Sequence, residues 1–288
     1  MKVLVTGATG RLGTQVCKEL CQRGHDVLGT DQRFTAERAV PLKLADLRQA
    51  DAVYPLLEGR EALVHLGNIP SLGAGPSPQV VLSDNVAMNA NVFRAAAELG
   101  VGRIVFASSL QAMMRLEEGR APDAAPKIPY FPLDGAAPAD PGHNFYGLSK
   151  EFGERLLRVQ SERFPQLACT ALRFPMLAGA WFYERLKAPL PLSRLNFCEA
   201  LTYLDFSDAA TLVGLVLERQ TAGYHQYFPA QALTLAGYSV ARTLSEFFPD
   251  TPLRRPADQI ESLVDLSALE RDVGFRPGPP LTVQLARP

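Results

Sequence analysis

The chain has 288 residues, of which 47% are apolar and 20% charged, and its formal net charge at pH 7 is −1. This composition excludes long intrinsic disorder, and the scattered Lys and Arg residues exclude the basic face of a nucleic-acid-binding domain. No apolar run approaches the roughly 20 residues of a membrane span, and the apolar stretch at the N-terminus is too short for the core of a signal peptide. We therefore expect a cytoplasmic protein with one large α/β domain, alone or with a smaller lobe.

Short apolar segments alternate with helical patterns through the first 175 residues. Residues 2–6 predict a buried parallel strand that stops at glycine, and the spacing from Leu12 to about Arg23 predicts the helix that follows. Further strands are expected over 26–30, 62–66, 103–107 and 168–173, a shorter αβ unit over 33–47, and helices over 51–58, 83–99 and 145–164. The alternation predicts an α/β fold with a doubly wound parallel sheet of the Rossmann type, covered by helices on both faces.

The alternation weakens after about residue 175, where proline becomes frequent. We predict a dinucleotide-binding domain over 1–175. Residues 176–288 are expected to form mostly a smaller substrate-binding lobe, with some segments returning to the main domain. Pro and Gly cluster between 122 and 142, where we expect a loop that borders the active site.

Glycines stand at positions 7, 10 and 13, between the first predicted strand and the first predicted helix. Gly7 permits a tight turn, Gly10 lets a diphosphate approach the backbone, and Gly13 lets the helix pack closely on the strand. The amides of Arg11 and Leu12 lie at the helix N-terminus, which favours negative charge. The segment therefore predicts the diphosphate site of a dinucleotide.

Asp31 closes the second predicted strand. Its carboxylate is expected to accept hydrogen bonds from the adenosine ribose hydroxyls and to repel a 2′-phosphate, so NAD is favoured over NADP as the cofactor. Arg33, two residues further on, carries a charge that could offset this repulsion. Asp46 and Leu47 follow the next strand and are expected either to hold the adenine edge or to cap a helix.

Tyr146 and Lys150 are four residues apart on a predicted helix and therefore share one face. An ammonium beside the phenol, together with a positive nicotinamide ring, should lower the pKa of Tyr146 from its ordinary value of about 10. The phenol would then exchange a proton with a substrate hydroxyl while hydride moves to or from nicotinamide. Ser109 follows a predicted strand and is expected to donate to the substrate oxygen, with Ser108 as its substitute.

Together these segments resemble the extended short-chain dehydrogenase/reductase family, which includes NAD-dependent sugar epimerases and dehydratases. The resemblance covers most of the chain and is carried by Thr6–Gly13, Asp46-Leu47, His65–Asn68, Asn85-Val86, Phe106–Ser109, Tyr146–Lys150, Leu172–Pro175 and Tyr203–Asp208. It implies further cofactor contacts at Leu66, Gly67, Asn68, Asn85, Ala107, Ser108, Tyr146, Lys150, Phe174 and Pro175. It also implies a homodimer in which the helices over 83–99 and 145–164 form the interface.

The sequence departs from the family pattern in two places. Dehydratases of this family carry acidic residues after the catalytic hydroxyl, whereas this chain has Leu110–Ala112 followed by Met113 and Met114, so water elimination is not expected. The family's nucleotide-sugar enzymes clamp the substrate diphosphate with arginines. The candidates in the short C-terminal lobe are Arg194, Arg254 and Arg255, and surface solvation explains each equally well.

The combined pattern predicts an NAD-dependent epimerase or oxidoreductase acting on a sugar or nucleotide sugar. The alternative is a dehydrogenase or reductase of a small free sugar, sugar acid or aldehyde, similar to the uronate dehydrogenases. A non-catalytic dinucleotide sensor would need the glycine loop but not the pair of Tyr146 and Lys150, so that pair argues against it.

No metal site is predicted, because the four cysteines lack the spacing and the nearby histidines of a ligand set. Cys17, Cys21, Cys169 and Cys198 are expected to be reduced and buried. His65 lies within a predicted strand and is expected to be a hydrogen-bonded core residue.

Overall fold

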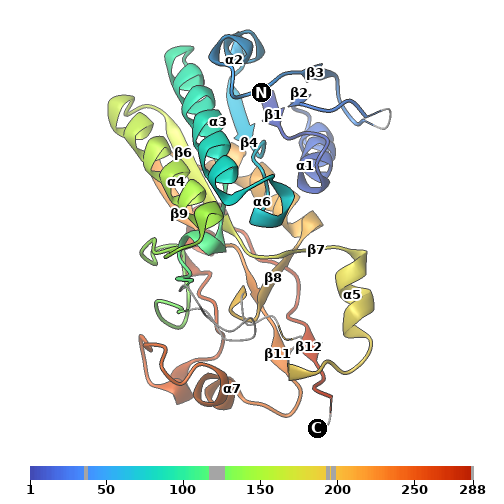
Figure 1. Ribbon diagram of the computed structural model, residues 1–288, viewed down its shortest axis with the longest axis vertical. Coiled ribbons are helices and arrows are strands. Elements are labelled where there is room, and N and C mark those ends of the chain that lie inside the picture. Colours follow the sequence, from blue (N-terminus) through green and yellow to red (C-terminus); the bar gives the residue numbers. More distant parts are fainter. Residues whose placement is uncertain (36–37, 117–126, 193–194, 196–198, 287–288) are drawn as a thin grey trace.

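We analysed a computed structural model, which describes residues 1–35, 38–116, 127–192, 195 and 199–286. A seven-stranded parallel sheet forms its centre, in the order β3-β2-β1-β4-β5-β6-β9 (Figure 1). The strands are β1 (Lys2–Thr6), β2 (Asp26–Asp31), β3 (Leu42–Leu44), β4 (Ala62–His65), β5 (Arg103–Ser109), β6 (Ala168–Phe174) and β9 (Gly223–Tyr227). The order runs outward from β1 to β3 and then returns to β4 on the other side of β1. Doubly wound sheets bind ligands outside the carboxyl ends of the strands at such a reversal.

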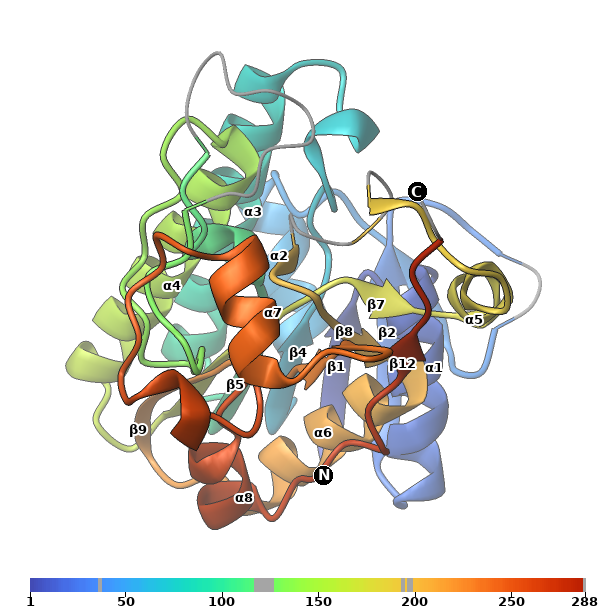
Figure 2. The same ribbon diagram turned by 90° about the horizontal axis from the view of Figure 1, so that it is seen from below.

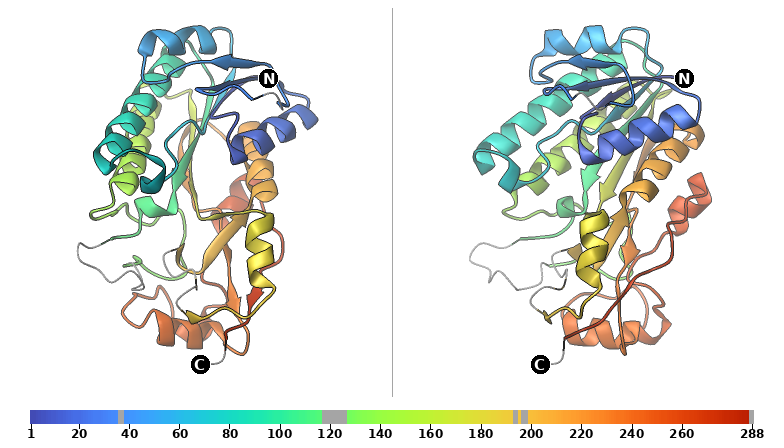
Figure 3. Two further views of the ribbon diagram at one scale, coloured as in Figure 1. Left: turned by 45° about the vertical axis from the view of Figure 1, so that its right-hand side comes forward. Right: turned by 90° about the vertical axis from the view of Figure 1, so that its right-hand side faces the viewer.

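Helices cover both faces of this sheet (Figure 3). One layer contains α2 (Ala50–Leu57), α3 (Pro78–Glu98) and α4 (Phe145–Arg163), and the other contains α1 (Arg11–Gln22) and α6 (Phe206–Arg219). The alternation of side chains along β1 explains the two layers, because Val3 and Val5 pack with the α1 and α6 side chains while Leu4 packs with those of α3. The two faces of the sheet therefore carry two separate apolar cores.

A smaller lobe lies at the carboxyl edge of the main sheet (Figures 1 and 2). The chain enters this lobe directly from the end of β6, since β7 (Leu177–Ala178) begins only three residues later. It contains α5 (Ala180–Leu186), β8 (Thr202–Asp205), β10 (Gln231–Ala232), β11 (Thr234–Leu235), α7 (Val240–Phe247) and β12 (Thr282–Val283). Its strands form one sheet in the order β10-β8-β7 and a second that pairs β11 with β12. Helix α8 (Ser267–Val273) packs instead against α6 of the main layer.

The predicted fold class is confirmed, and most element boundaries agree within one or two residues. The helix predicted over 83–99 begins earlier, at Pro78, because the Ser77 hydroxyl caps it by accepting a hydrogen bond from Val80 N. The αβ unit predicted over 33–47 is wrong in its helical part, because the described residues of that stretch form only β3. The division at residue 175 stays a prediction, and both α6 and β9 lie in the main layers. Residues 122–126 of the expected active-site loop lie outside the described residues.

Candidate active site

The glycine loop joins β1 to α1, at the place where the sequence predicts the diphosphate site. Gly7 has a positive φ of 68°, which favours glycine. A Cβ at Gly13 would lie 2.1 Å from the carbonyl oxygen of Gly7, so only glycine allows α1 to approach the strand this closely. Gly10 is the N-cap of α1, which has no side-chain cap and no acidic residue in its first turn. The helix N-terminus is therefore suited to a diphosphate, and these residues fit NAD.

The Asp31 carboxylate lies beside this loop at the end of β2. It accepts hydrogen bonds from Thr9 N at 3.1 Å and from Thr9 Oγ1 at 2.7 Å, and its other oxygen accepts from Gln32 N at 2.7 Å. These contacts fix the orientation of the carboxylate next to the diphosphate site. Arg33 is exposed, two residues beyond the strand. The proposed contact between Asp31 and the adenosine ribose stays a prediction.

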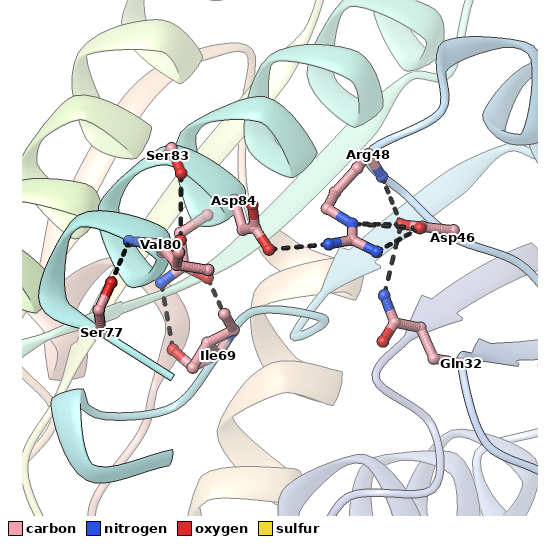
Figure 4. A network of polar contacts seen from close by, with 9 residues as sticks. Gln32, Asp46, Arg48, Ile69, Ser77, Val80, Ser83 and Asp84 are labelled. Atoms are coloured by element: carbon pink, nitrogen blue, oxygen red, sulfur yellow. Dashed lines mark hydrogen bonds and ion pairs between the residues drawn. The ribbon is translucent and has the colours of Figure 1, made fainter. Parts of the chain in front are cut away.

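Asp46 is bound by an arginine of its own loop (Figure 4). Arg48 Nε and Nη2 donate to the two oxygens of Asp46 at 2.9 and 2.7 Å, and Arg48 Nη1 donates to Asp84 on α3 at 2.9 Å. The hydrogen bond from Arg48 lowers the pKa of Asp46. The alternative of a helix cap is wrong, because the N-cap of α2 is Gln49. The Leu47 side chain is buried in the core, and adenine contact at this pair stays a prediction.

The segment after β4 is held by buried side chains. The Thr6 hydroxyl oxygen accepts from Leu66 N at 3.1 Å and from Gly67 N at 3.0 Å, and the hydroxyl lies 2.7 Å from His65 Nδ1. The other ring nitrogen of His65 lies 2.9 Å from Asn89 Oδ1, and burial lowers the pKa of the ring to about 3. His65 is thus a neutral, hydrogen-bonded core residue, as predicted.

Two asparagines connect this segment to the catalytic helix. Asn85 Oδ1 accepts from Ile69 N at 2.7 Å, and its Nδ2 donates to the hydroxyl of Ser149 on α4 at 3.0 Å. Asn68 Oδ1 accepts from Lys150 Nζ at 2.8 Å. The residues that sequence similarity assigns to the cofactor therefore share one hydrogen-bond network with α4.

Tyr146, Lys150 and Ser109 lie together at the carboxyl end of β5. Lys150 Nζ donates to Ala107 O at 2.8 Å and lies 5.6 Å from the centroid of the Tyr146 ring. The Ser109 hydroxyl accepts from Gln111 N at 3.1 Å, which leaves its proton available for the hydrogen bond that it shares with Tyr146. The phenol and a serine hydroxyl therefore lie together, and their contact with one substrate oxygen stays a prediction.

In the protein without its cofactor, the pKa of Tyr146 is raised rather than lowered. Burial raises the pKa of Tyr146 above that of a free tyrosine, although the hydrogen bond from Ser109 lowers it in part. Burial also lowers the pKa of Lys150 to about 7, so this ammonium is itself weakened as a neighbouring charge. Without the cofactor, burial therefore outweighs the influences that lower the pKa of Tyr146, and the predicted lowering by Lys150 and nicotinamide together stays a prediction. The positive nicotinamide ring is the remaining source of such a shift.

The sequence analysis did not predict a buried ion pair that lies next to the end of β5. Arg173 on β6 donates from Nε and Nη2 to the two oxygens of Glu154 on α4, both at 2.8 Å. The Ser108 hydroxyl donates to Glu154 Oε1 at 2.5 Å. Ser108 therefore faces this ion pair, whereas Ser109 faces Tyr146. The only sequence signal was the position of Glu154, four residues after Lys150 on the same helix face.

A second carboxylate that was missed, Glu199, lies near Tyr146. Its Oε2 accepts from Met176 N at 3.0 Å, and its carboxylate is hydrogen-bonded to the side chain of Gln111. The charge of Glu199 raises the pKa of Tyr146. Nothing in the local sequence around Glu199 marked it, because the chain brings it to the site from a segment 49 residues after Lys150.

The remaining residues that the sequence suggested for the site are either buried in the core or exposed on the surface. Phe174 and Pro175 are buried at the end of β6, and their contact with nicotinamide stays a prediction. Arg254 pairs with Asp134, and Arg255 is exposed. Arg194 lies outside the described residues. A cavity of about 330 Å³ lies in the C-terminal lobe, where its lining includes Leu233 and Leu263 but none of the catalytic candidates.

The cysteines are free where the structure describes them. Cys17 and Cys169 are buried, as predicted, but Cys21 is exposed, because it lies on the solvent side of α1, and Cys198 lies outside the described residues. Within the described ranges, no group of three or more His, Cys, Asp or Glu side chains is arranged to hold a metal ion. No helix in the described part of the chain has the length and apolar character needed to cross a bilayer. The cytoplasmic location and the homodimer stay predictions.

A doubly wound sheet, a glycine loop at the N-terminus of α1 and a buried Tyr-Lys pair are together typical of dinucleotide-dependent enzymes. The family model described as "NAD dependent epimerase/dehydratase family" matches residues 3–197, and the chain belongs to this family. Membership confirms the predicted resemblance and the expectation of an NAD-dependent enzyme.

The similar proteins have different activities. A 2-alkyl-3-oxoalkanoate reductase from Stenotrophomonas maltophilia is 31% identical over 182 residues, which cover 62% of this chain and 52% of the reductase. A uronate dehydrogenase from Pseudomonas syringae is 28% identical over 167 residues, covering 57% of this chain and 55% of that enzyme. The chain thus spans just over half the length of these relatives. The crystal structure of UDP-glucose 4-epimerase from Bifidobacterium longum with NAD+ and UDP has the same fold, with a TM-score of 0.68 at 18% identity, over 97% of this chain and 94% of the epimerase.

Proposed function

We propose that this enzyme is an NAD-dependent dehydrogenase that oxidises a carbinol carbon of a small, sugar-like substrate. The observation that carries the proposal is the convergence of Ser109, Tyr146 and Lys150 at the carboxyl end of β5, at the same edge of the parallel sheet as the glycine loop that follows β1. When bound, NAD supplies the hydride acceptor.

The chain's own residues divide the remaining work. The first-turn amides of α1 bind the diphosphate, and Asp31 accepts hydrogen bonds from the adenosine ribose. Ser109 orients the substrate hydroxyl, and Tyr146 takes the proton of that hydroxyl. Lys150 is held in place by Asn68 and Ala107, so its charge stays close to the phenol. Burial excludes water from the proton transfer, because Tyr146 and Lys150 are both buried.

A nucleotide-sugar epimerase is the competing function, and the contacts of one candidate diphosphate-binding residue, Arg254, support the smaller substrate. Arg254 is engaged by the Asp134 carboxylate and lies 5.0 Å from the centroid of the Tyr130 ring. Arg254 would have to break its ion pair with Asp134 before it could bind a diphosphate. The observation supports a free sugar, sugar acid or aldose over a nucleotide sugar.

The near-ultraviolet absorbance of NADH tests the proposal. Purified enzyme is mixed with NAD and with aldoses, uronates or UDP-glucose in separate reactions. A dehydrogenase should accumulate NADH with a free sugar, whereas an epimerase should convert UDP-glucose without net NADH formation. Replacing Tyr146 by Phe should slow turnover by about 100- to 10,000-fold, the usual contribution of general acid–base catalysis. Full activity in that variant would refute the proposed role of Tyr146.

A further inference from the structure

Glu199 places a carboxylate where two neighbouring strands of the sheet, β5 and β6, end. Its Oε2 accepts from Met176 N, two residues beyond the end of β6, and its carboxylate is bonded to Gln111, two residues beyond the end of β5. Strands β5 and β6 are neighbours in the sheet, and Ser109 is the last residue of β5. The carboxylate therefore lies at the same sheet edge as the catalytic serine.

A chain of amides connects Glu199 to the first turn of the catalytic helix. Asn144 Oδ1 accepts from Tyr146 N and Gly147 N, both at 3.1 Å, so the Nδ2 of Asn144 is its donor end. That Nδ2 donates to Gln111 Oε1 at 2.8 Å, which leaves Gln111 Nε2 to donate to Glu199. Each amide orientation is fixed by the one before it. Glu199 is thus an acceptor that terminates a directed chain of hydrogen bonds.

The carboxylate is held there at an energetic cost. Burial raises the pKa of Glu199 to about 7, although the hydrogen bonds from Gln111 and Met176 oppose this shift. The next two residues, Ala200 and Leu201, have positive φ values of 54° and 52°, which is unfavourable for residues other than glycine. Such strain persists only where the surrounding structure imposes it, and it concentrates at functional sites.

Glu199 retains part of its surface, and its charge influences the phenol of Tyr146. Its residue is partly accessible, unlike the fully buried Ala200 and Leu201 that follow it. Its charge raises the pKa of Tyr146, so the two groups interact electrostatically. Two donors of the protein already bind the carboxylate, and its other lone pairs can accept from a ligand.

We propose that Glu199 accepts a hydrogen bond from a hydroxyl of the substrate and thereby selects neutral polyhydroxylated substrates over anionic ones. An ionised carboxylate can only accept hydrogen bonds, so it favours a substrate hydroxyl, and in a buried site it repels a substrate carboxylate strongly. This inference rests on the proposed function and narrows its substrate class to neutral sugars or polyols.

Two pairs of sugars test the selection, D-galactose with D-galacturonate and D-glucose with D-glucuronate, because the members of each pair differ only at C6. The kcat/KM values are measured at pH 8.5, where Glu199 is ionised. Wild-type enzyme should prefer the neutral member. The isosteric Glu199→Gln should shift the ratio of neutral to acidic sugar by about tenfold or more toward the acid, because it weakens a charged hydrogen bond and removes a repulsion.

The matched control is Glu58→Gln, which removes the charge of an exposed glutamate at the end of α2 and should leave the ratio unchanged. Thermal unfolding of each variant establishes that it is folded. An unchanged ratio in Glu199→Gln, or a wild-type preference for the acids, would overturn the inference while leaving a Tyr146-dependent dehydrogenase in place.

Binding to the enzyme–NADH complex separates the two proposals. If none of the four sugars yields NADH, the proposed dehydrogenase activity on free sugars fails. Calorimetric Kd values for the same sugars then still decide the role of Glu199. A neutral preference that falls in Glu199→Gln supports the inference, and absent binding or an unchanged preference refutes it.

Discussion

The buried pair of Glu154 and Arg173 gives the sharpest test of how this structure is held together. The exposed fractions of these side chains are 2% for Arg173 and 6% for Glu154, and two parallel hydrogen bonds of 2.8 Å join them. Glu154→Gln keeps the shape of the side chain but removes its charge and replaces one acceptor oxygen by an amide that cannot accept. The Arg173 guanidinium then remains buried without a counter-charge.

Removing one partner of a buried ion pair typically costs about 3–5 kcal/mol, because the other charge stays desolvated. We therefore expect Glu154→Gln to lower the free energy of unfolding by about 3–5 kcal/mol. At roughly 2–4 °C per kcal/mol, this corresponds to a decrease in Tm of about 6–20 °C. The double variant with Met at both positions should lose less than the single variant, because no unpaired charge is buried.

Urea unfolding followed by far-ultraviolet circular dichroism and by Trp181 fluorescence measures this loss, and coincident transitions justify a two-state treatment. The control is Asp140→Asn, which breaks an ion pair with Arg115 whose side chains are 51% and 44% exposed. An exposed pair of this kind contributes about 0–1 kcal/mol. A loss for Glu154→Gln no larger than that of the control would show that the buried pair does not stabilise the fold as argued.

The other predictions concern the cofactor, the proton transfer and the dimer. Gly13→Ala should raise the Kd for NAD at least tenfold by calorimetry, because its Cβ would lie 2.1 Å from a carbonyl oxygen, whereas Gly73→Ala, with open space around it, should not. Asp31→Ala should lower the kcat/KM ratio of NAD to NADP about tenfold or more, because a like charge is removed from the ribose site. The oxidation rate should rise with pH, since burial raises the pKa of the phenol that must lose its proton, and Tyr146→Phe should abolish that slope; a flat wild-type profile would contradict this. If α4 forms a dimer interface, Phe152→Glu, at a position 41% exposed in the isolated chain, should shift the mass measured by light scattering to that of a monomer.

The structural elements predicted correctly are those that neighbouring residues determine. The strand-to-helix turn depends on three glycines within seven residues, and the helix face shared by Tyr146 and Lys150 depends on one helical repeat, whereas the roles of these residues stay predictions. The central strands were recognisable because burial on both faces makes them continuously apolar. The start of α3 was missed because its first turn is defined by the Ser77 cap rather than by apolar periodicity. The helix expected within 33–47 is absent from the described residues of that stretch. Pairing of β3 with β2, rather than the local sequence pattern, determines the conformation there.

The partners of the site could not be predicted in the same way, because the fold brings them together from separate segments. Glu154 and Arg173 lie on α4 and β6, and their mutual contact follows only from how that helix packs on the sheet. Glu199 reaches the site through a connection in the C-terminal lobe whose path no local pattern indicates.

The end of β5 joins these separate elements into one active site. Ser108 and Ser109 are consecutive residues of a strand, so their side chains point to opposite faces. One hydroxyl is bound to the buried ion pair of Glu154 and Arg173, and the other is bound to Tyr146. Glu154 and Tyr146 lie on the same helix, so both serine hydroxyls join the end of β5 to α4. The buried ion pair is therefore connected, through two consecutive residues of β5, to the serine for which we propose a catalytic role.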